Sequence, residues 1–554
     1  MNRMSDLADR GYGYMRITNK IMQKNNLSNI NTNKIYQDKL STQMSTQKKI
    51  NRPSDDPVIA IRALRLRSNV TEITQYYSKN IPDANSWIDV TEDALKTLSN
   101  VVTGMINQCN KGAAGYLKTE DRQIALEQLK ALGEEVYSTG DADYAGRYVF
   151  TGYRTDTSLS FGKAENTNYS ITEQLTSSAI DSVTKVIIPE HNGKDLLDLN
   201  SSNYMDADMQ AIDDEEISTV EVHRIRLAYG SCSDYSTVDG TKYPDVSPKI
   251  TYTDANGQKQ TWGGFKNPAD PASTGDIQLV HSYEDPYAVV SNDPDAIVYV
   301  PETGEIFLGE NRYKTLMGTK DDDTTVGNEA EIQVTYEKSS WQKGDLRPEH
   351  YFYCESSPRT EESTLYNKTY LSGNAERQDI EYDVGFNQTI RVNSTADQCF
   401  QHGIGREVDD LVNAMKDVQE LEGIKANLDK LLESAVEGSN EEAVLKKQLK
   451  ATEKALTFAK DKEQRLFERG ITTFQGYLDD ANLCITECGT RSKKLELVEN
   501  RTQNQKTTFE TLKSQNEDID ITEVMIYLSS AELTYQAALM ATGKVSQTTL
   551  LNFI

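Results

Sequence analysis

The fold of the first part of the chain depends on one stretch, INRPSDDPVIAIRALRLRS (residues 50–68), which lies between two long helical patterns. The first pattern is a polar helix that starts near Ile17 and is predicted to end at Ile50. A proline cannot continue a helix and disfavours helical backbone in the residue before it. Pro53 therefore forbids helix at Arg52 and marks the stop.

The same stretch carries the start signals of the next helix. Asp55 or Asp56 can accept hydrogen bonds from the free N–H groups of that helix as its N-cap. Pro57 fits the first turn, where no N–H is required. We interpret residues 51–57, NRPSDDP, as a joint between two helices.

The helix after the joint has a sustained heptad pattern, which indicates about 70 Å of helix at ~1.5 Å per residue. Its 4-3 stripe runs through Ile59, Ala63, Leu66, Val70, Ile73, Tyr77, Asn80, Ala84, Trp87, Thr91, Ala94, Leu98, Val101 and Met105. Pro82 is predicted to kink this helix or leave a local break. Another helix, about 119–139, is predicted to fold back after it.

The end of the chain is helical again. A helical pattern runs from Arg406 to Ser514 with a break near residues 437–442. A second heptad closes the chain through Ile521, Val524, Leu528, Ala531, Tyr535, Ala538, Thr542 and Val545. A stripe with so few large residues is typical of a helix that shares its core with other helices.

The middle of the chain has the composition of strands and turns. Ten of the 13 prolines and 16 of the 29 tyrosines lie between residues 156 and 400. Hairpins are predicted at 249–262, where Asn-Gly is a strong turn signal, and at 296–309. A third, at 380–393, is predicted to place Ile380, Tyr382, Val384 and Phe386 on one face.

These patterns predict an α+β fold. Its N- and C-terminal segments form a long antiparallel helical coiled-coil rod, and a β-rich domain is inserted in the middle. The predicted parts are a disordered extension (1–14), an N-terminal helix (15–50), the rod (51–155 and 401–516), the β-rich body (156–400) and a C-terminal helix (517–554).

Composition excludes several classes of protein. The net charge is −27, although residues 1–70 carry +8, and this argues against nucleic acid as a general partner. No apolar run approaches the ~20 residues that span a bilayer, so membrane insertion is not expected. The start of the chain lacks the apolar region of a secretory signal peptide. Six scattered cysteines are too few for a disulfide framework.

No motif predicts catalysis, a cofactor or a metal site. There is no P-loop and no H-E-x-x-H, and the five histidines are isolated. Cys484 and Cys488 share a helix face and are interpreted as core residues, and KDDDTT (320–325) as a solvated turn. Arg62, Arg65 and Arg67 form a basic face that is predicted to make ion pairs across a helix interface.

Three segments resemble the flagellin superfamily: the joint, AGRYVFTGYRTDT (145–157) and YLSSAELTYQAALMATGKVSQTTLLNFI (527–554). Within it they are most similar to the hook-associated protein 3 family, the hook–filament junction proteins. The joint of this chain has a proline after Arg52 and another after Asp56, whereas flagellins usually have a pattern closer to Ser-Ala-x-Asp-Asp-Ala there. The segment 145–157 matches the family motif Gly-x-Tyr-x-Phe-x-Gly-x-x-Thr. The resemblance covers residues 15–155 and 378–554. Two features depart from it: members of the family would begin near Met15, and the middle body is larger than a minimal member requires.

The resemblance implies a structural protein whose terminal helices form the inner tube of the flagellar axis and become ordered on assembly. It implies as partners other copies in a ring, a neighbouring hook-associated protein, flagellin, the type III export apparatus and an export chaperone at the C-terminal helix. The location implied is extracellular, without a cleavable signal peptide. The residues expected at subunit contacts are Asn51, Arg52, Pro53, Asp55, Asp56, Pro57, Leu528, Tyr535, Leu550 and Leu551.

Three other interpretations stay open. A filament flagellin would have the same helices, and its copy number and location would distinguish it. An enzyme inserted in the β-rich body, such as a protease, would need a catalytic pattern that the sequence does not show. A coiled-coil adhesin or secreted effector would not need weak helices of nearly matched length at both ends.

Overall fold

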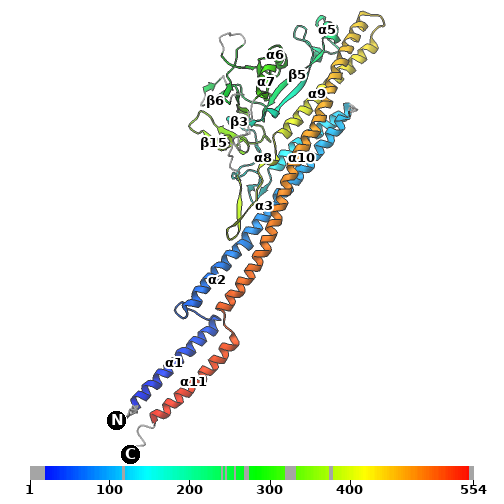
Figure 1. The fold of residues 1–554 in the computed structure, drawn as a ribbon. Helices are drawn as coiled ribbons and strands as arrows, with labels where there is room; N and C mark the ends of the chain where they lie inside the picture. Colours follow the sequence, from blue (N-terminus) through cyan, green and yellow to red (C-terminus); the bar gives the residue numbers. More distant parts are fainter. Residues whose placement is uncertain are drawn as a thin grey trace, which may run out of the picture. The chain divides into compact units, whose positions relative to one another are not determined.

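The computed structural model describes residues 19–114, 119–238, 241–243, 246–254, 257–267, 274–318, 332–372 and 378–547. The chain divides into two compact units. Unit 1 comprises residues 1–82, 383–388 and 496–554, and unit 2 comprises residues 83–382 and 389–495. Long helices in both terminal parts and a β-rich region between them confirm the predicted α+β class (Figure 1).

The helices carry most of the described chain. The longer ones are α1 (Asn19–Thr46), α2 (Pro57–Gln75), α3 (Ile81–Ala113), α4 (Thr119–Gly140), α9 (Gly403–Ser434), α10 (Asn440–Glu517) and α11 (Ile521–Gln547). The shorter ones are α5 (Ala207–Ala211), α6 (Pro286–Asn292), α7 (Glu310–Met317) and α8 (Ala396–Cys399). The predicted helix at 119–139 and the break between two C-terminal helices are confirmed.

Unit 1 is built from two antiparallel helix pairs. The C-terminal part of α1 packs on the first turns of α11, where Leu40 contacts Val524 and its neighbours, and the two helices run side by side (Figure 1). In the second pair, the Asn516 side chain of α10 donates a hydrogen bond to the carbonyl of Ile59 in α2 (3.2 Å). The polar first helix ends at Thr46 rather than at the predicted Ile50, because the backbone beyond it pairs with residues 517–519.

Pro82 does not end the helix, and the structure has a π-helical turn next to the position where the sequence predicts a kink or a local break. Residues Tyr76–Asn80, which precede Pro82 by about one turn, form this π-helical turn between α2 and α3. There the N–H of Ile81 bonds to the carbonyl of Tyr76, five residues back. A π-helical turn accommodates the missing N–H of a proline without interrupting the helix.

Unit 2 contains a helical layer made of α3, α4, α9 and the first part of α10. Ser99 in α3 donates a hydrogen bond to Asn482 in α10 (3.3 Å), and the Phe467 ring occupies the space that a side chain at Gly112 would need. α4 packs on α9, and Arg122 pairs with Glu463 across to α10 (3.2 Å). The heptad positions from Ala84 to Met105 are all buried, and those from Ile59 to Asn80 are buried or half-buried.

The β-rich region contains two main sheets. The five-stranded sheet has the order β10-β11-β12-β5-β4, and the six-stranded sheet has the order β15-β14-β3-β13-β8-β9. The first is made of β10 (Ile277–Leu279), β11 (Ile297–Val300), β12 (Glu305–Leu308), β5 (Ser218–Arg226) and β4 (Ile180–Ile187). The second is made of β15 (Thr364–Tyr366), β14 (Tyr353–Ser356), β3 (Tyr169–Leu175), β13 (Ile332–Lys338), β8 (Lys249–Thr253) and β9 (Lys259–Trp262). Only β10 and β11 pair in parallel among these strands.

Three smaller hairpins complete the described strands. They are β1–β2 (Asp143–Tyr144 and Arg147–Tyr148), β6–β7 (Ser236–Val238 and Thr241–Tyr243) and β16–β17 (Glu381–Gly385 and Gln388–Arg391). The hairpins predicted at 249–262, 296–309 and 380–393 are therefore confirmed, although Asn256 lies outside the described residues. One detail is wrong: Val384 is buried, but Phe386 lies at the turn of β16–β17 and is 88% exposed.

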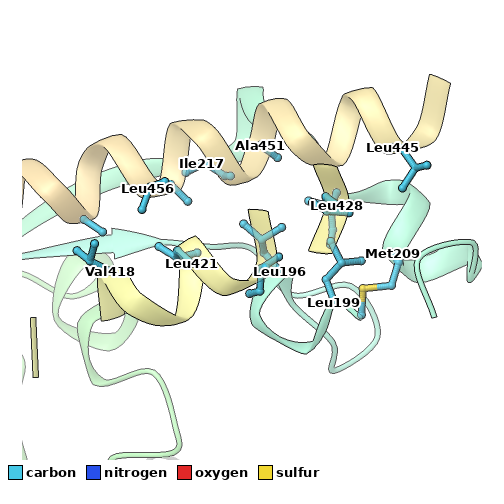
Figure 2. Close-up of a cluster of buried hydrophobic side chains, with 14 residues drawn as sticks. Leu196, Leu199, Met209, Ile217, Val418, Leu421, Leu428, Leu445, Ala451 and Leu456 are labelled. Carbon is cyan, nitrogen blue, oxygen red and sulfur yellow. The ribbon is translucent and has the colours of Figure 1, made fainter. Parts of the chain in front are cut away.

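Apolar side chains pack together where α9 and α10 meet. Side chains of both helices interlock with those of the segment 196–217 in one buried cluster (Figure 2). The cluster consists of Leu196, Leu199, Met209, Ile212, Ile217, Val418, Leu421, Ile424, Leu428, Leu445, Ala451, Ala455, Leu456 and Ala459. This helical hairpin is therefore covered by residues of its own unit.

Candidate functional site

The joint between α1 and α2 is built as a helix start. Asp56 is the N-cap of α2, and its carboxylate accepts hydrogen bonds from the N–H groups of Val58 (2.9 Å) and Ile59 (3.1 Å). Of the two aspartates that the sequence offers, Asp56 is therefore the cap. Pro57 occupies the first helical position, as predicted.

Asp55 does not cap the helix but stabilises the turn that precedes it. Its carboxylate accepts hydrogen bonds from the N–H groups of Arg52 (2.9 Å) and Asn51 (3.1 Å), so it closes the turn before the helix. These backbone hydrogen bonds favour the charged form and lower the pKa of Asp55. Asn51, Arg52, Pro53, Asp55 and Pro57 are all exposed.

A buried carboxylate connects the end of α1 to the link between α10 and α11. Glu517 is 3% exposed, and it receives a bidentate ion pair from Arg67 of α2, with N···O distances of 2.7 and 2.8 Å. Lys48 lies 3.8 Å from Glu517 and also pairs with Asp518. The N–H of Lys49 donates a hydrogen bond to the Glu517 carbonyl (2.7 Å). Backbone and side-chain bonds therefore both attach the segment after α1 to Glu517.

This arrangement confirms part of the predicted ion pairing. Arg67 makes its pair across a helix interface, and the hydrogen bond from its guanidinium to Glu517 raises the pKa of Arg67. Arg62 and Arg65 are exposed and form no ion pair with any residue that the structure describes. Sequence reasoning did not single out Lys48 or Glu517, because 450 residues or more separate the paired side chains.

The α1–α11 pair has a thin core. Leu40, Val524 and Ala531 are buried, while Leu528 and Tyr535 are half-buried on the same heptad stripe. Of the predicted stripe only Ile521 is exposed, and the Val545 side chain is not described. Leu550 and Leu551 lie outside the described residues, so their predicted contacts stay predictions.

Many large apolar side chains of the terminal helices are exposed. We call them the terminal apolar surface: Ile21, Met22, Leu27, Ile35 and Tyr36 on α1, Val58, Ile61 and Leu64 on α2, and Ile521, Met525, Ile526, Tyr527, Leu533, Leu539 and Met540 on α11. Leu27 is 61% exposed and Leu533 is 68% exposed. Exposed apolar side chains gathered in this way mark interaction surfaces.

The histidines have structural surroundings. His191, His223 and His281 each lie within 3.5 Å of a carboxylate at the surface. Burial lowers the pKa of His350 to about 4 and that of His402 to about 3, so both are neutral at pH 7. No group of three potential metal ligands occurs among the described residues, and the KDDDTT segment lies outside them.

Unit 2 contains a cavity of about 840 Å³ between the six-stranded sheet and the helices. Residues that line it include Glu173, Arg226, His350, Tyr351, His402 and Arg469. Burial raises the pKa of Glu173 to about 7, but the N–H of Ala228 and the hydroxyl of Tyr336 both donate to its Oε1 atom. That oxygen is already bonded within the protein, so the cavity does not present Glu173 as a free base.

Within the described residues, no helix combines the length and the apolar character that crossing a membrane requires. The features that the structure brings together are instead the joint, the Glu517 ion pairs and the terminal apolar surface. All three belong to unit 1: the Glu517 carboxylate of the ion pairs is buried within the chain, whereas the terminal apolar surface is exposed.

Comparison with known proteins identifies relatives of part of the chain. The family model described as "Bacterial flagellin N-terminal helical region" matches residues 17–155. Flagellar hook-associated protein 3 of Salmonella typhimurium is 26% identical over 196 residues, which are 33% of this chain and 62% of that protein. Flagellar hook-associated protein 3 of Escherichia coli is 26% identical over 193 residues, which are 34% of this chain and 59% of that protein. These matches span less than two thirds of the relatives' length.

Solved structures give a weaker likeness. The crystal structure of flagellar hook associated protein-3 from Legionella pneumophila is 10% identical with a TM-score of 0.28, and the match covers 81% of this chain and 97% of that one. So low a score does not establish a common fold. The sequence matches confirm the resemblance to hook-associated protein 3 in the flagellin superfamily.

Proposed function

We propose that this chain is a structural axial protein of the bacterial flagellum that joins the hook to the filament. The observation that carries this proposal is the terminal apolar surface on α1, α2 and α11, in segments whose sequence motifs resemble hook-associated protein 3. Side chains such as Leu533 and Met540 would be buried when neighbouring copies pack against these helices. The β-rich body would face outward, and the protein would perform no catalysis.

Assembly would proceed head-to-tail between identical chains. Each copy presents the exposed apolar residues of α11 and α2 on different helices, so one copy can use both to contact different neighbours. Contacts of this heterologous kind propagate around a ring or along a helix. The joint residues Asn51, Arg52, Pro53, Asp55, Asp56 and Pro57, together with Leu528, Tyr535, Leu550 and Leu551, are proposed to lie at these contacts.

The thin core of the α1–α11 pair supports coupled folding and assembly. Three buried apolar residues give little stability to two helices of 28 and 27 residues. Neighbouring copies would add the missing apolar contacts, and the terminal helices would become rigid only in the assembled axis. The charge of +8 over residues 1–70 would favour acidic neighbours, although exposed ion pairs contribute only about 0–1 kcal/mol each.

The proposed partners follow from this role. They are other copies of the chain in a ring, a neighbouring hook-associated protein, flagellin, the flagellar type III export apparatus and an export chaperone that binds the C-terminal helix. The proposed location is outside the cell, reached without a cleavable signal peptide. No cofactor, nucleic acid or membrane insertion is part of the proposal.

A filament flagellin is the second candidate. The match to the flagellin N-terminal helical region over residues 17–155 favours it as much as it favours a junction protein. The two prolines of the joint and the segment 145–157 favour the junction protein, and both curated relatives carry the name hook-associated protein 3.

Immunogold labelling of sheared flagella, with an antibody against residues 156–400, separates the candidates. The expected result is label confined to a short collar at the boundary between hook and filament. Label along the whole filament would make the chain a flagellin. Absence of label from flagella would contradict the flagellar assignment and favour a secreted effector or adhesin.

A further inference from the structure

Two cysteines that are far apart in the sequence meet in the core of unit 2. Cys399 is the last residue of α8, and Cys484 lies on α10. Their sulfur atoms are 3.5 Å apart, and both side chains are buried, with exposed fractions of 1% and 5%. Cys488, one turn further along α10, lies 3.9 Å from the Ser394 hydroxyl. None of these cysteines forms a disulfide in the structure.

The positions of the two sulfurs allow a covalent bond to form between them. A disulfide has an S–S length of about 2.05 Å, so the sulfurs must approach by roughly 1.5 Å. Cys399 stands at the end of a helix of four residues, and Phe400 after it has non-helical backbone with φ −108° and ψ 66°. We therefore expect the movement to come from the Cys399 end, while the long helix α10 stays in place.

The hydrogen bond between the thiols makes them chemically unequal. The Cys399 S–H donates to the Cys484 sulfur. This bond stabilises a thiolate at Cys484 and lowers its pKa, while the pKa of Cys399 is raised by the same bond and by burial. Since the thiolate is the form that reacts with peroxide, Cys484 is the expected site of the first attack.

We propose that Cys399 and Cys484 are an oxidisable pair that a small peroxide converts to a disulfide in the folded protein. The Cys484 thiolate attacks a peroxide oxygen, the O–O bond breaks, and a sulfenic acid and hydroxide form. That hydroxide takes the proton of the Cys399 thiol, and the Cys399 thiolate so formed attacks the Cys484 sulfur and displaces a second hydroxide, which takes up a proton from solvent. Overall, two thiols and one hydrogen peroxide give one disulfide and two molecules of water, so the sulfurs are oxidised and the peroxide oxygens are reduced.

The cross-link would join the end of the β-rich region to α10. It closes a loop of about 85 residues that contains α9 and only those residues of the buried cluster of Figure 2 that lie on α9 and α10. A cross-link over a loop of this length restricts the unfolded chain and stabilises the folded one. The site goes beyond the proposed function and does not depend on it, since the chemistry needs only the fold of unit 2 and an oxidising environment.

Peptide mapping of the purified full-length chain tests the proposal. The folded protein is treated with hydrogen peroxide, blocked with an alkylating agent, digested without reductant and analysed by mass spectrometry. The expected product is a peptide pair that links Cys399 to Cys484, is two hydrogen atoms lighter than its parts and separates on treatment with dithiothreitol. The midpoint of thermal unfolding should rise by about 2 °C or more on oxidation and return on reduction.

Single substitutions supply the controls. Cys399→Ser and Cys484→Ser should abolish the linked peptide, whereas Cys488→Ser should retain it. A link between Cys484 and Cys488, or sulfinic acid at Cys484 without any cross-link, would overturn the proposal. Peptide mapping of the unsubstituted chain already shows which cysteines are linked, so the test does not depend on the folding of a variant.

Discussion

The α1–α11 pair and the α9–α10 hairpin are both antiparallel pairs of amphipathic helices, but only one of them is complete. Fourteen buried apolar residues lie between α9, α10 and the segment 196–217 (Figure 2). Between α1 and α11 only Leu40, Val524 and Ala531 are buried, and large side chains such as Leu27 and Leu533 remain exposed.

The two pairs differ in whether another segment of the chain covers their apolar residues, and not in the periodicity of those residues. The segment 196–217 supplies Leu196, Leu199, Met209, Ile212 and Ile217 to the α9–α10 hairpin, so its apolar stripe is satisfied within unit 2. No described segment of the chain does the same for the outer faces of α1 and α11. We call the α9–α10 hairpin the finished pair, because its apolar residues are covered within the chain. We call α1–α11 the unfinished pair, because large apolar residues remain exposed on it, and this is the pair proposed to assemble.

The largest expected effect comes from placing a charge in the finished pair. Leu421→Asp removes a side chain that is 3% exposed and buries a carboxylate in the α9–α10 cluster. We expect the free energy of unfolding of unit 2 to fall by about 4 kcal/mol or more. Thermal or urea unfolding, followed by circular dichroism, measures this change.

Leu533→Asp is the matched substitution in the unfinished pair. Its side chain is already 68% exposed, so the unfolding of the isolated chain should change by no more than about 0.5 kcal/mol. Assembly into flagella should be lost, as measured by the amount of the protein in sheared flagella. A strongly destabilised Leu533→Asp monomer, or a variant that assembles normally, would remove the contrast between the two pairs.

The second effect concerns the buried charges of unit 2. Arg224 is 3% exposed; it bonds to Asp181 on β4 at 2.8 and 3.0 Å, and it also contacts Glu305 on β12 and Asp410 on α9. Arg224→Met removes a buried cation from all three carboxylates, although Asp181 and Asp410 keep their ion pairs with Arg469. The substitution should cost about 3 kcal/mol.

The exposed Arg65 of α2 supplies the control for this substitution. Arg65→Met should change the unfolding free energy by less than about 0.5 kcal/mol, because Arg65 has no ion pair with a described residue. Denaturant unfolding of both variants gives the comparison. Equal effects at the two positions would show that the network around Arg224 does not fasten the sheet to α9.

The third effect is a pH dependence that originates in unit 2. Burial raises the pKa of Glu173 from its ordinary value of 4.5 to about 7, so the folded state holds a proton that the unfolded state releases between these values. This group therefore contributes stability below pH 4.5 that is lost as the pH rises through 7. Glu173→Gln stays neutral and keeps an oxygen that can accept from Ala228 and Tyr336.

We expect Glu173→Gln to match the unsubstituted chain near pH 4.5 and to be more stable by about 1–3 kcal/mol at pH 8. Unfolding midpoints measured across this range give the result. Buried histidines act in the opposite direction: the lowered pKa of His350 gives stability above about pH 6.5 that is lost as the pH falls toward 4. The comparison at fixed pH isolates Glu173, since both chains contain His350. A gain of the same size at both pH values would contradict the assignment.

Periodicity predicted the parts of this fold that depend on local sequence. Every heptad position from Ala84 to Met105 is buried, and Pro57 and an aspartate begin α2 as the joint indicates. Contacts between distant residues could not be predicted in this way. The Arg67–Glu517 pair and the meeting of Cys399 with Cys484 require knowledge of which helices lie together, and single-sequence patterns do not contain it.

The candidate site was predicted unevenly for the same reason. The joint residues have strong local signals, because proline and aspartate fix backbone geometry where they stand. The exposed residues of α1 have no such signal: nothing in the local sequence around Leu27 marks it as a side chain that is 61% exposed. The face of an amphipathic helix that a partner covers can be identified only after the neighbours within the chain are placed.

The smallest expected effect compares the N-caps of α2 and α11. Asp56 accepts from Val58 and Ile59, and Asp520 accepts in the same way from Thr522 (2.9 Å) and Glu523 (3.2 Å). Replacing either aspartate with alanine removes hydrogen bonds that are worth about 1 kcal/mol, and asparagine should restore most of it. The chemistry of the two caps is thus equal, and only the surroundings of the two helices differ.

These surroundings decide where each loss is observed. α2 pairs with α10 through Arg67 and Glu517, so Asp56→Ala should lower the unfolding free energy by about 1 kcal/mol. α11 rests on a thin core, so Asp520→Ala should instead speed hydrogen exchange in its first turns by about fivefold, with little change in global unfolding. Equal loss of global stability in both variants would mean that α11 already unfolds together with α2 and α10, and that the terminal pair is not waiting for neighbouring copies to become stable.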